Sequence, residues 1–165
     1  MPHYHDPRIE RLAHAAADAM PRFLRDFEEG RVPTSSGALG DVDAGEAFAI
    51  VKALLAEGEH VIAAPVALLL AVCHPDVPGH AYFAGRTFQK LQAWQLAGWL
   101  FEQAARRADS ALARYRLGSC LQALGQRALA IEQFERAYDL ARTGSSDHRL
   151  QEHIEQRLLE SNVAG

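Results

Sequence analysis

Histidine and cysteine are the side chains in this sequence with the widest chemical repertoire, and one group of them lies close together. The chain has eight histidines and two cysteines, and Cys73, His74 and His80 follow one another within a short stretch. Thiolate and imidazole groups are the usual ligands of zinc, but these three do not complete a tetrahedral ligand set. They also fall in a predicted loop. We therefore expect no metal and no cofactor.

Other signs of catalysis are missing as well. The remaining histidines are scattered through the chain, without a pattern typical of a metal site. There is no glycine-rich phosphate-binding loop and no nucleophile motif between a strand and a helix. The sequence predicts that the protein is not an enzyme, so its function should lie in binding.

The size and charge of the chain further limit the kinds of protein it can be. The 165 residues are 48% hydrophobic and 23% charged, which fits one folded domain. The net charge is −4, and without a cluster of basic residues we expect no nucleic-acid partner. The longest uncharged apolar run, Val61 to Cys73, is shorter than the roughly 20 residues that cross a bilayer, so we expect no direct membrane insertion. The absence of an apolar leader and the low cysteine content predict a cytoplasmic location.

The positions of the side chains in the fold should follow from a pattern that repeats along the sequence. Its clearest copy reads Leu117-Gly118-x-x-Leu121 and then Ala130-x-x-x-Phe134-x-x-Ala137, which resembles the tetratricopeptide repeat. A second copy lies 33 residues earlier, with Ala84-Gly85-x-x-Phe88 and Ala97-x-x-x-Phe101-x-x-Ala104. A fainter third copy lies 34 residues before that, with Ile50-Val51-x-x-Leu54 and Ala63-x-x-x-Ala67-x-x-Leu70. Small residues in this pattern allow two antiparallel helices to touch, and large ones fill the space between repeats.

The pattern predicts an all-α tetratricopeptide-repeat solenoid of three helix pairs, with an N-terminal helix and a C-terminal capping helix. The expected divisions are an N-terminal helical segment at 1–28, a linker at 29–43, repeats at 44–143 (44–77, 78–110 and 111–143) and a cap at 144–165. Two prolines are expected to disturb helices: Pro21 should kink or split the N-terminal one, and Pro65 should interrupt the second helix of the first repeat.

The first helix of each pair should line a concave groove where a partner peptide binds. The side chains that should face this groove recur at three positions of each repeat: Phe48, Lys52 and Leu55; Tyr82, Arg86 and Gln89; Tyr115, Ser119 and Gln122. Aromatic rings mixed with amides suit an extended peptide, although the three aromatics could instead be packing between repeats. Lys52 and Arg86 are the expected groove cations, too few to favour an acidic tail over an apolar segment.

The opposite, convex face carries an unusual number of apolar residues. We expect self-association or intramolecular cover at a patch made of Leu12, Phe23, Pro65, Val66, Trp99 and Leu100. Either the N-terminal helix or a second protomer should cover it. The alternative is that these are scattered surface apolar residues of the ordinary kind.

Taken together, the layout resembles the class II chaperones of type III secretion systems (the SycD/LcrH type). The most specific stretch is LGSCLQALGQRALAIEQFERAYDLA, Leu117 to Ala141, and Phe27-Glu-Glu-Gly30 is similar to the family's exit from its first helix. The chain departs from the family in its first repeat, where Phe48 and Leu55 stand in place of the usual tyrosines.

The resemblance implies a cytoplasmic bacterial chaperone that holds the hydrophobic translocator proteins of a type III secretion system soluble and secretion-competent. It implies that the groove binds an extended segment of Pro-x-Leu-x-x-Pro character, through the nine groove residues named above. It also implies a homodimer when no client is bound. The alternative is a general tetratricopeptide scaffold that assembles another bacterial complex.

Overall fold

The computed structural model describes residues 7–31, 43–144 and 148–163, and these form α-helices joined by short turns. The helices are α1 (Pro7–Glu28), α2 (Ala44–Ala56), α3 (His60–Cys73), α4 (Pro78–Lys90), α5 (Trp94–Arg107), α6 (Ala111–Ala123), α7 (Arg127–Thr143) and α8 (His148–Val163). The prediction of an all-α helical-repeat fold is therefore confirmed. Most of the predicted linker, 32–42, lies outside the described residues.

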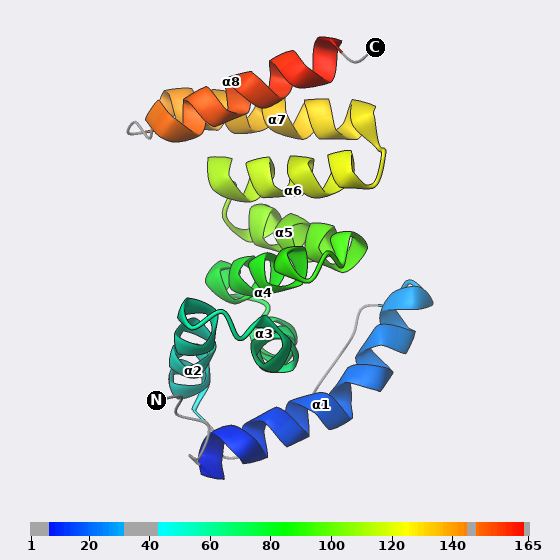
Figure 1. Ribbon diagram of the computed structural model, residues 1–165, viewed down its shortest axis with the longest axis vertical. Helices are drawn as coiled ribbons and strands as arrows, with labels where there is room; N and C mark the ends of the chain where they lie inside the picture. Colours follow the sequence, from blue (N-terminus) through cyan, green and yellow to red (C-terminus); the bar gives the residue numbers. More distant parts are fainter. Residues whose placement is uncertain (1–6, 32–42, 145–147, 164–165) are drawn as a thin grey trace.

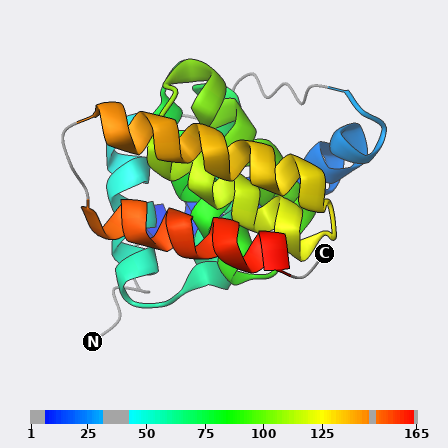
Figure 2. The ribbon, with the colours of Figure 1, turned by 90° about the horizontal axis from the view of Figure 1, so that it is seen from above.

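Each predicted repeat range contains one antiparallel helix pair: α2 with α3, α4 with α5, and α6 with α7. From α2 onward, consecutive helices pack on one another, and α4 to α8 lie one above another along the long axis of the molecule (Figure 1). Seen from above, α8 runs alongside α7 and covers the end of the stack (Figure 2). This is the arrangement in which each repeat buries the apolar face of its neighbour.

The turn inside each pair uses one left-handed residue at the same place in the repeat. Gly58 (φ 82°), Gln92 (φ 59°) and Gly125 (φ 74°) occupy it in the first, second and third repeats. Glycine adopts this conformation without a Cβ clash, whereas glutamine is strained there. The repeat therefore preserves its turn geometry even where its sequence departs from the pattern.

Close contact within a pair depends on a glycine facing a phenylalanine. In the third repeat, a Cβ at Gly118 would lie 2.6 Å from Cε1 of Phe134, and in the second, one at Gly85 would lie 2.9 Å from Cδ1 of Phe101. Both rings are fully buried. The phenylalanine ring of the motif thus packs directly against its glycine.

Neither proline breaks its helix. Both α1 and α3 continue through their prolines, so Pro21 does not split α1 and Pro65 does not interrupt α3. A proline lacks a backbone N–H, and its ring crowds the carbonyl four residues earlier. For Pro65 that carbonyl belongs to Val61, which is 72% exposed. Water can satisfy a carbonyl in such a position, which lowers the cost of the proline.

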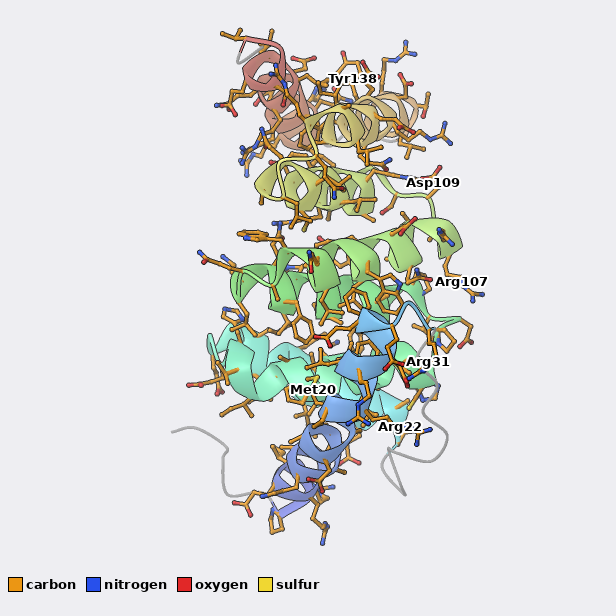
Figure 3. The ribbon with its side chains drawn as sticks, turned by 90° about the vertical axis from the view of Figure 1, so that its right-hand side faces the viewer. Met20, Arg22, Arg31, Arg107, Asp109 and Tyr138 are labelled. Atoms are coloured by element: carbon orange, nitrogen blue, oxygen red, sulfur yellow. The ribbon has the colours of Figure 1, made fainter. Side chains whose placement is uncertain are left out.

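The N-terminal helix lies outside the stack. α1 runs obliquely past α3 (Figure 1), and it packs on α3. Its sides differ: Met20 packs toward the apolar core while Arg22 points away (Figure 3). No helix among the described residues is long and apolar enough to cross a membrane.

Asp109, in the connection between the second and third repeats, joins two helices of the third. It accepts hydrogen bonds from Nε of Arg114 on α6 (2.7 Å) and Nη2 of Arg136 on α7 (2.8 Å). Burial alone would raise the pKa of this carboxyl, but the hydrogen bonds from the two arginines prevail and lower it. Asp109 lies at the edge of the stack, beyond Arg107 at the end of α5 (Figure 3).

Candidate functional site

We call the surface formed by α2, α4 and α6 the first-helix face. The nine residues predicted to line it all lie on these three helices. Lys52 and Arg86 are exposed, and the other seven are half-buried. Three sets of side-chain contacts connect neighbouring helices along this face, and they show how it is built.

The first contact joins α2 to α4 through aromatic rings. Phe48 meets Phe83 edge to face, with ring centroids 5.1 Å apart. A cation lies over each ring: Nζ of Lys52 is 4.9 Å from the Phe48 centroid, and Cζ of Arg86 is 5.7 Å from that of Phe83. Cation–π attraction at these distances holds both charged groups beside an apolar surface.

The second contact joins α4 to α6 and is polar. Nη1 of Arg116 donates a hydrogen bond to Oε1 of Gln89 at 3.2 Å. Nε of the same guanidinium is buried and has no hydrogen-bond partner. This group is therefore only partly satisfied by the rest of the chain.

The third contact joins α6 to the capping helix. Nε2 of Gln122 lies 3.4 Å from Oγ of Ser161, and Nη1 of Arg157 lies 3.4 Å from Oε1 of Gln122. The Ser119 hydroxyl instead donates to the backbone carbonyl of Tyr115, 3.0 Å away on its own helix. At this end, the predicted amide and hydroxyl groups already have partners within the fold.

The two tyrosines face inward as well as outward. Tyr82 contacts Phe101 (centroids 5.7 Å apart) and Tyr115 contacts Phe134 (5.8 Å), each on the second helix of its own repeat. Both tyrosines are half-buried. These two contacts lie within a repeat, whereas the alternative raised by the sequence was packing between repeats; the part of each tyrosine that is exposed contributes to the surface. Phe48, by contrast, packs between repeats, against Phe83.

Sequence reasoning omitted three residues from this site. Phe83 and Arg116 make the contacts between first helices, and Lys90 lies one turn beyond Arg86 on α4. A signal was available, because Phe83 and Arg116 directly follow the aromatics at Tyr82 and Tyr115 in the repeat. That position faces the preceding first helix in the stack, because Phe83 contacts α2 and Arg116 contacts α4.

A histidine pair borders the α2 end of the face. His80 is 6% exposed, and its ring centroid lies 4.9 Å from that of Phe48 and 5.9 Å from that of His74. Burial, followed by the charge of His74, lowers the pKa of His80, although Asp76 and the backbone at Leu70 oppose the shift. In the part of the chain that the structure describes, no group of three or more His, Cys, Asp or Glu side chains could hold a metal ion.

Cys120 is unsuited to nucleophilic chemistry. It lies on α6 and is fully buried. Burial raises the pKa of its thiol to about 12, against a smaller opposing effect of Arg116. The thiolate that would attack a substrate is therefore not formed near neutral pH.

The residues of the second predicted surface, the convex patch, come from α1, α3 and α5, and α1 packs on the other two helices within a single chain. Leu12, Phe23, Val66 and Leu100 are buried, while Pro65 and Trp99 are half-buried. The Trp99 ring meets those of Phe23 and Phe27 edge to face, at centroid distances of 6.1 Å and 5.7 Å. Of the two covers expected for this patch, the structure contains the N-terminal helix.

Comparisons with known proteins show which solved structures share this fold. No family model matches the sequence, and no curated protein does either. Solved structures do. A type III secretion system complex from Aeromonas hydrophila superimposes with a TM-score of 0.72 at 20% identity, covering 89% of this chain and 97% of that one. The chain shares the fold of these secretion proteins.

Two more solved structures show how far this likeness extends. The Yersinia enterocolitica secretion chaperone SycD, solved with a peptide of the translocator YopD, has a TM-score of 0.69 at 17% identity, covering 79% of this chain and 96% of its own. The Sgt2 tetratricopeptide domain from Aspergillus fumigatus has a TM-score of 0.59 at 19% identity, covering 72% and 81%. The resemblance predicted from the sequence is thus confirmed for the fold.

Proposed function

We propose that this chain is a non-enzymatic cytoplasmic chaperone of a bacterial type III secretion system. Its clients are hydrophobic translocator proteins, and it keeps them soluble and secretion-competent by binding an extended, apolar, proline-containing segment. The observation that carries this proposal is the aromatic and cationic surface on the first-helix face. It occurs in a fold shared with SycD, which was solved with a translocator peptide.

The chemistry of the face suits such a segment. Rings at Phe48, Phe83 and Tyr82 can bury apolar side chains, and the amide of Gln89 can pair with the backbone of an extended peptide. Prolines in the client reduce the conformational entropy lost on binding. A protein whose segments insert into lipid is prone to aggregate in water. Masking its apolar segment is therefore useful without any catalysis.

Co-expression tests the proposal directly. The chain is produced with the apolar-rich protein encoded by the neighbouring gene, and the soluble fraction is separated by size-exclusion chromatography. We expect the neighbour to be soluble only with this chain and to co-elute with it. A neighbour that is soluble alone, or that stays insoluble in the presence of this chain, contradicts the proposal.

Variants locate the site in the same assay. Tyr82→Ala combined with Tyr115→Ala should weaken client binding about tenfold or more, as truncated aromatic anchors generally do. Tyr138→Ala is the matched control, because this half-buried tyrosine lies on α7, a second helix. Far-UV circular dichroism checks that each variant stays helical. Equal binding by the double variant and the control would place the site elsewhere.

A general tetratricopeptide scaffold is the second candidate. It is favoured by the likeness to the Sgt2 tetratricopeptide domain from Aspergillus fumigatus. The co-expression result separates the two, because a scaffold does not require its neighbour to be insoluble alone.

A further inference from the structure

Two of the three helices of the first-helix face, α4 and α6, differ in charge from the rest of the molecule. The chain as a whole carries a net charge of −4. α4 (PGHAYFAGRTFQK) and α6 (ALARYRLGSCLQA) contain no acidic residue at all, yet they carry four of the chain's cations, namely Arg86, Lys90, Arg114 and Arg116. Arg114 is engaged by Asp109, which leaves the other three.

Two of these cations lie beside Gln89. Arg86 precedes it by one turn on the same face of α4, and Arg116 donates to it from α6 at 3.2 Å; Lys90 lies one turn beyond Arg86. The guanidinium of Arg86 is held over the Phe83 ring, 5.7 Å from its centroid. No carboxylate of the described residues lies within ion-pair distance of Arg86, Lys90 or Arg116.

Of these three cations, Arg116 has the least complete set of hydrogen-bond partners for its buried atoms. Its side chain is half-buried, one nitrogen donates to an uncharged amide, and Nε is buried without a partner. Because Nε is closed to solvent, a client can reach only the outer nitrogens of this guanidinium, and no carboxylate of the described residues lies within ion-pair distance of its charge. A carboxylate is the group that best answers a guanidinium, because it can accept two parallel hydrogen bonds.

We propose that the first-helix face binds a carboxylate of its client segment between Arg86 and Arg116, with Lys90 nearby. The occupant is thus an extended protein segment with an apolar side chain against Phe48 and Phe83 and one Asp or Glu a few residues away. This inference rests on the proposed function and refines it, since the sequence alone pointed to a purely apolar segment.

Labelled peptides provide the test. Fluorescence anisotropy with the full-length chain compares peptides of the form Pro-x-Leu-x-x-Pro in which every x is Gln with three others, each carrying Glu at one x. We expect one Glu peptide to bind about fivefold to tenfold more tightly than the Gln peptide. The gain should largely vanish when salt is raised from about 0.05 M to about 0.5 M.

Variants assign the gain to the proposed pair. Arg86→Gln and, separately, Arg116→Gln should remove most of it, whereas Arg86→Lys should keep part. Arg107→Gln is the matched control: it makes the same change in charge at an exposed arginine at the end of α5. Arg86 is exposed, so its replacement leaves the fold intact even if the Arg116 variant is unstable.

Each outcome has a distinct meaning. Equal affinity for Gln and Glu peptides, or a gain that survives Arg86→Gln, overturns the carboxylate site and leaves the proposed function standing. Failure of every peptide to bind overturns both. A preference for Glu that Arg107→Gln also removes reflects overall charge and contradicts the proposal.

Discussion

At the scale of single residues, glycine decides how closely two helices of a repeat approach. The motif places Gly118 against Phe134, and the packing leaves no room for even one methyl group between them. Gly98 on α5 is different, because a Cβ there would meet the Cβ of Cys120 at 3.5 Å, an ordinary contact distance. Two glycines with the same helical propensity should therefore respond oppositely to the same substitution.

Gly118→Ala should lower the free energy of unfolding by about 1–3 kcal/mol, because the buried Phe134 ring must shift. Gly98→Ala should instead leave stability unchanged or raise it by up to about 1 kcal/mol, through the better helix propensity of alanine. Urea denaturation followed by circular dichroism measures both. A tolerated alanine at Gly118 would mean that the helices of the third repeat are free to move apart.

At the scale of elements, α1 is attached to the repeats through α3 and α5. It packs on α3, and Phe23 and Phe27 hold the Trp99 ring of α5. Removal of that ring should release the helix from α5 without dismantling the repeats, because α4 to α7 pack on one another.

Trp99→Ala should destabilise the protein by about 2–3 kcal/mol and selectively increase amide hydrogen exchange in α1. Trp94→Ala is the matched control, since Trp94 begins the same helix and makes no ring contact with α1 among the described residues. Mass spectrometry after hydrogen exchange gives the readout for each helix. If α1 keeps its protection in Trp99→Ala, the aromatic contact does not hold it in place.

At the scale of the whole molecule, α1 has a bearing on self-association. Since α1 already covers the Trp99 side of the convex patch, we expect a homodimer of the intact chain to use the outer side of α1, where Leu24 is 38% exposed. The resemblance to secretion chaperones predicts association through this N-terminal region.

The full chain should therefore dimerise, and deletion of residues 1–28 should abolish the dimer; Leu24→Asp should weaken it while the fold persists. Sedimentation velocity over a range of protein concentrations measures all three. A monomeric full chain refutes the prediction. Stronger association after the deletion would show that the uncovered Trp99 patch, rather than α1, is the adhesive surface.

The repeat architecture could be predicted from the sequence because its cause is local and periodic. Leu117, Gly118, Ala130 and Phe134 mark where helices touch, and three copies in phase leave one way to stack them. The same periodicity placed Phe48, Tyr82 and Tyr115 on the first helices. These properties depend on which residue stands at which position of a repeat, which the sequence states directly.

Contacts between elements that are distant in the chain needed the tertiary structure. Only the packing of α1 decides that Phe23 and Phe27 cover Trp99, and only the spacing of α4 and α6 brings Arg116 to Gln89. Lys52 and Arg86 are the groove cations expected from the sequence, and the contact of Arg116 with Gln89 depends on how α4 and α6 pack. Charges and rings on different helices interact only if they lie close together. The distance between them is set by the packing of all the helices in between.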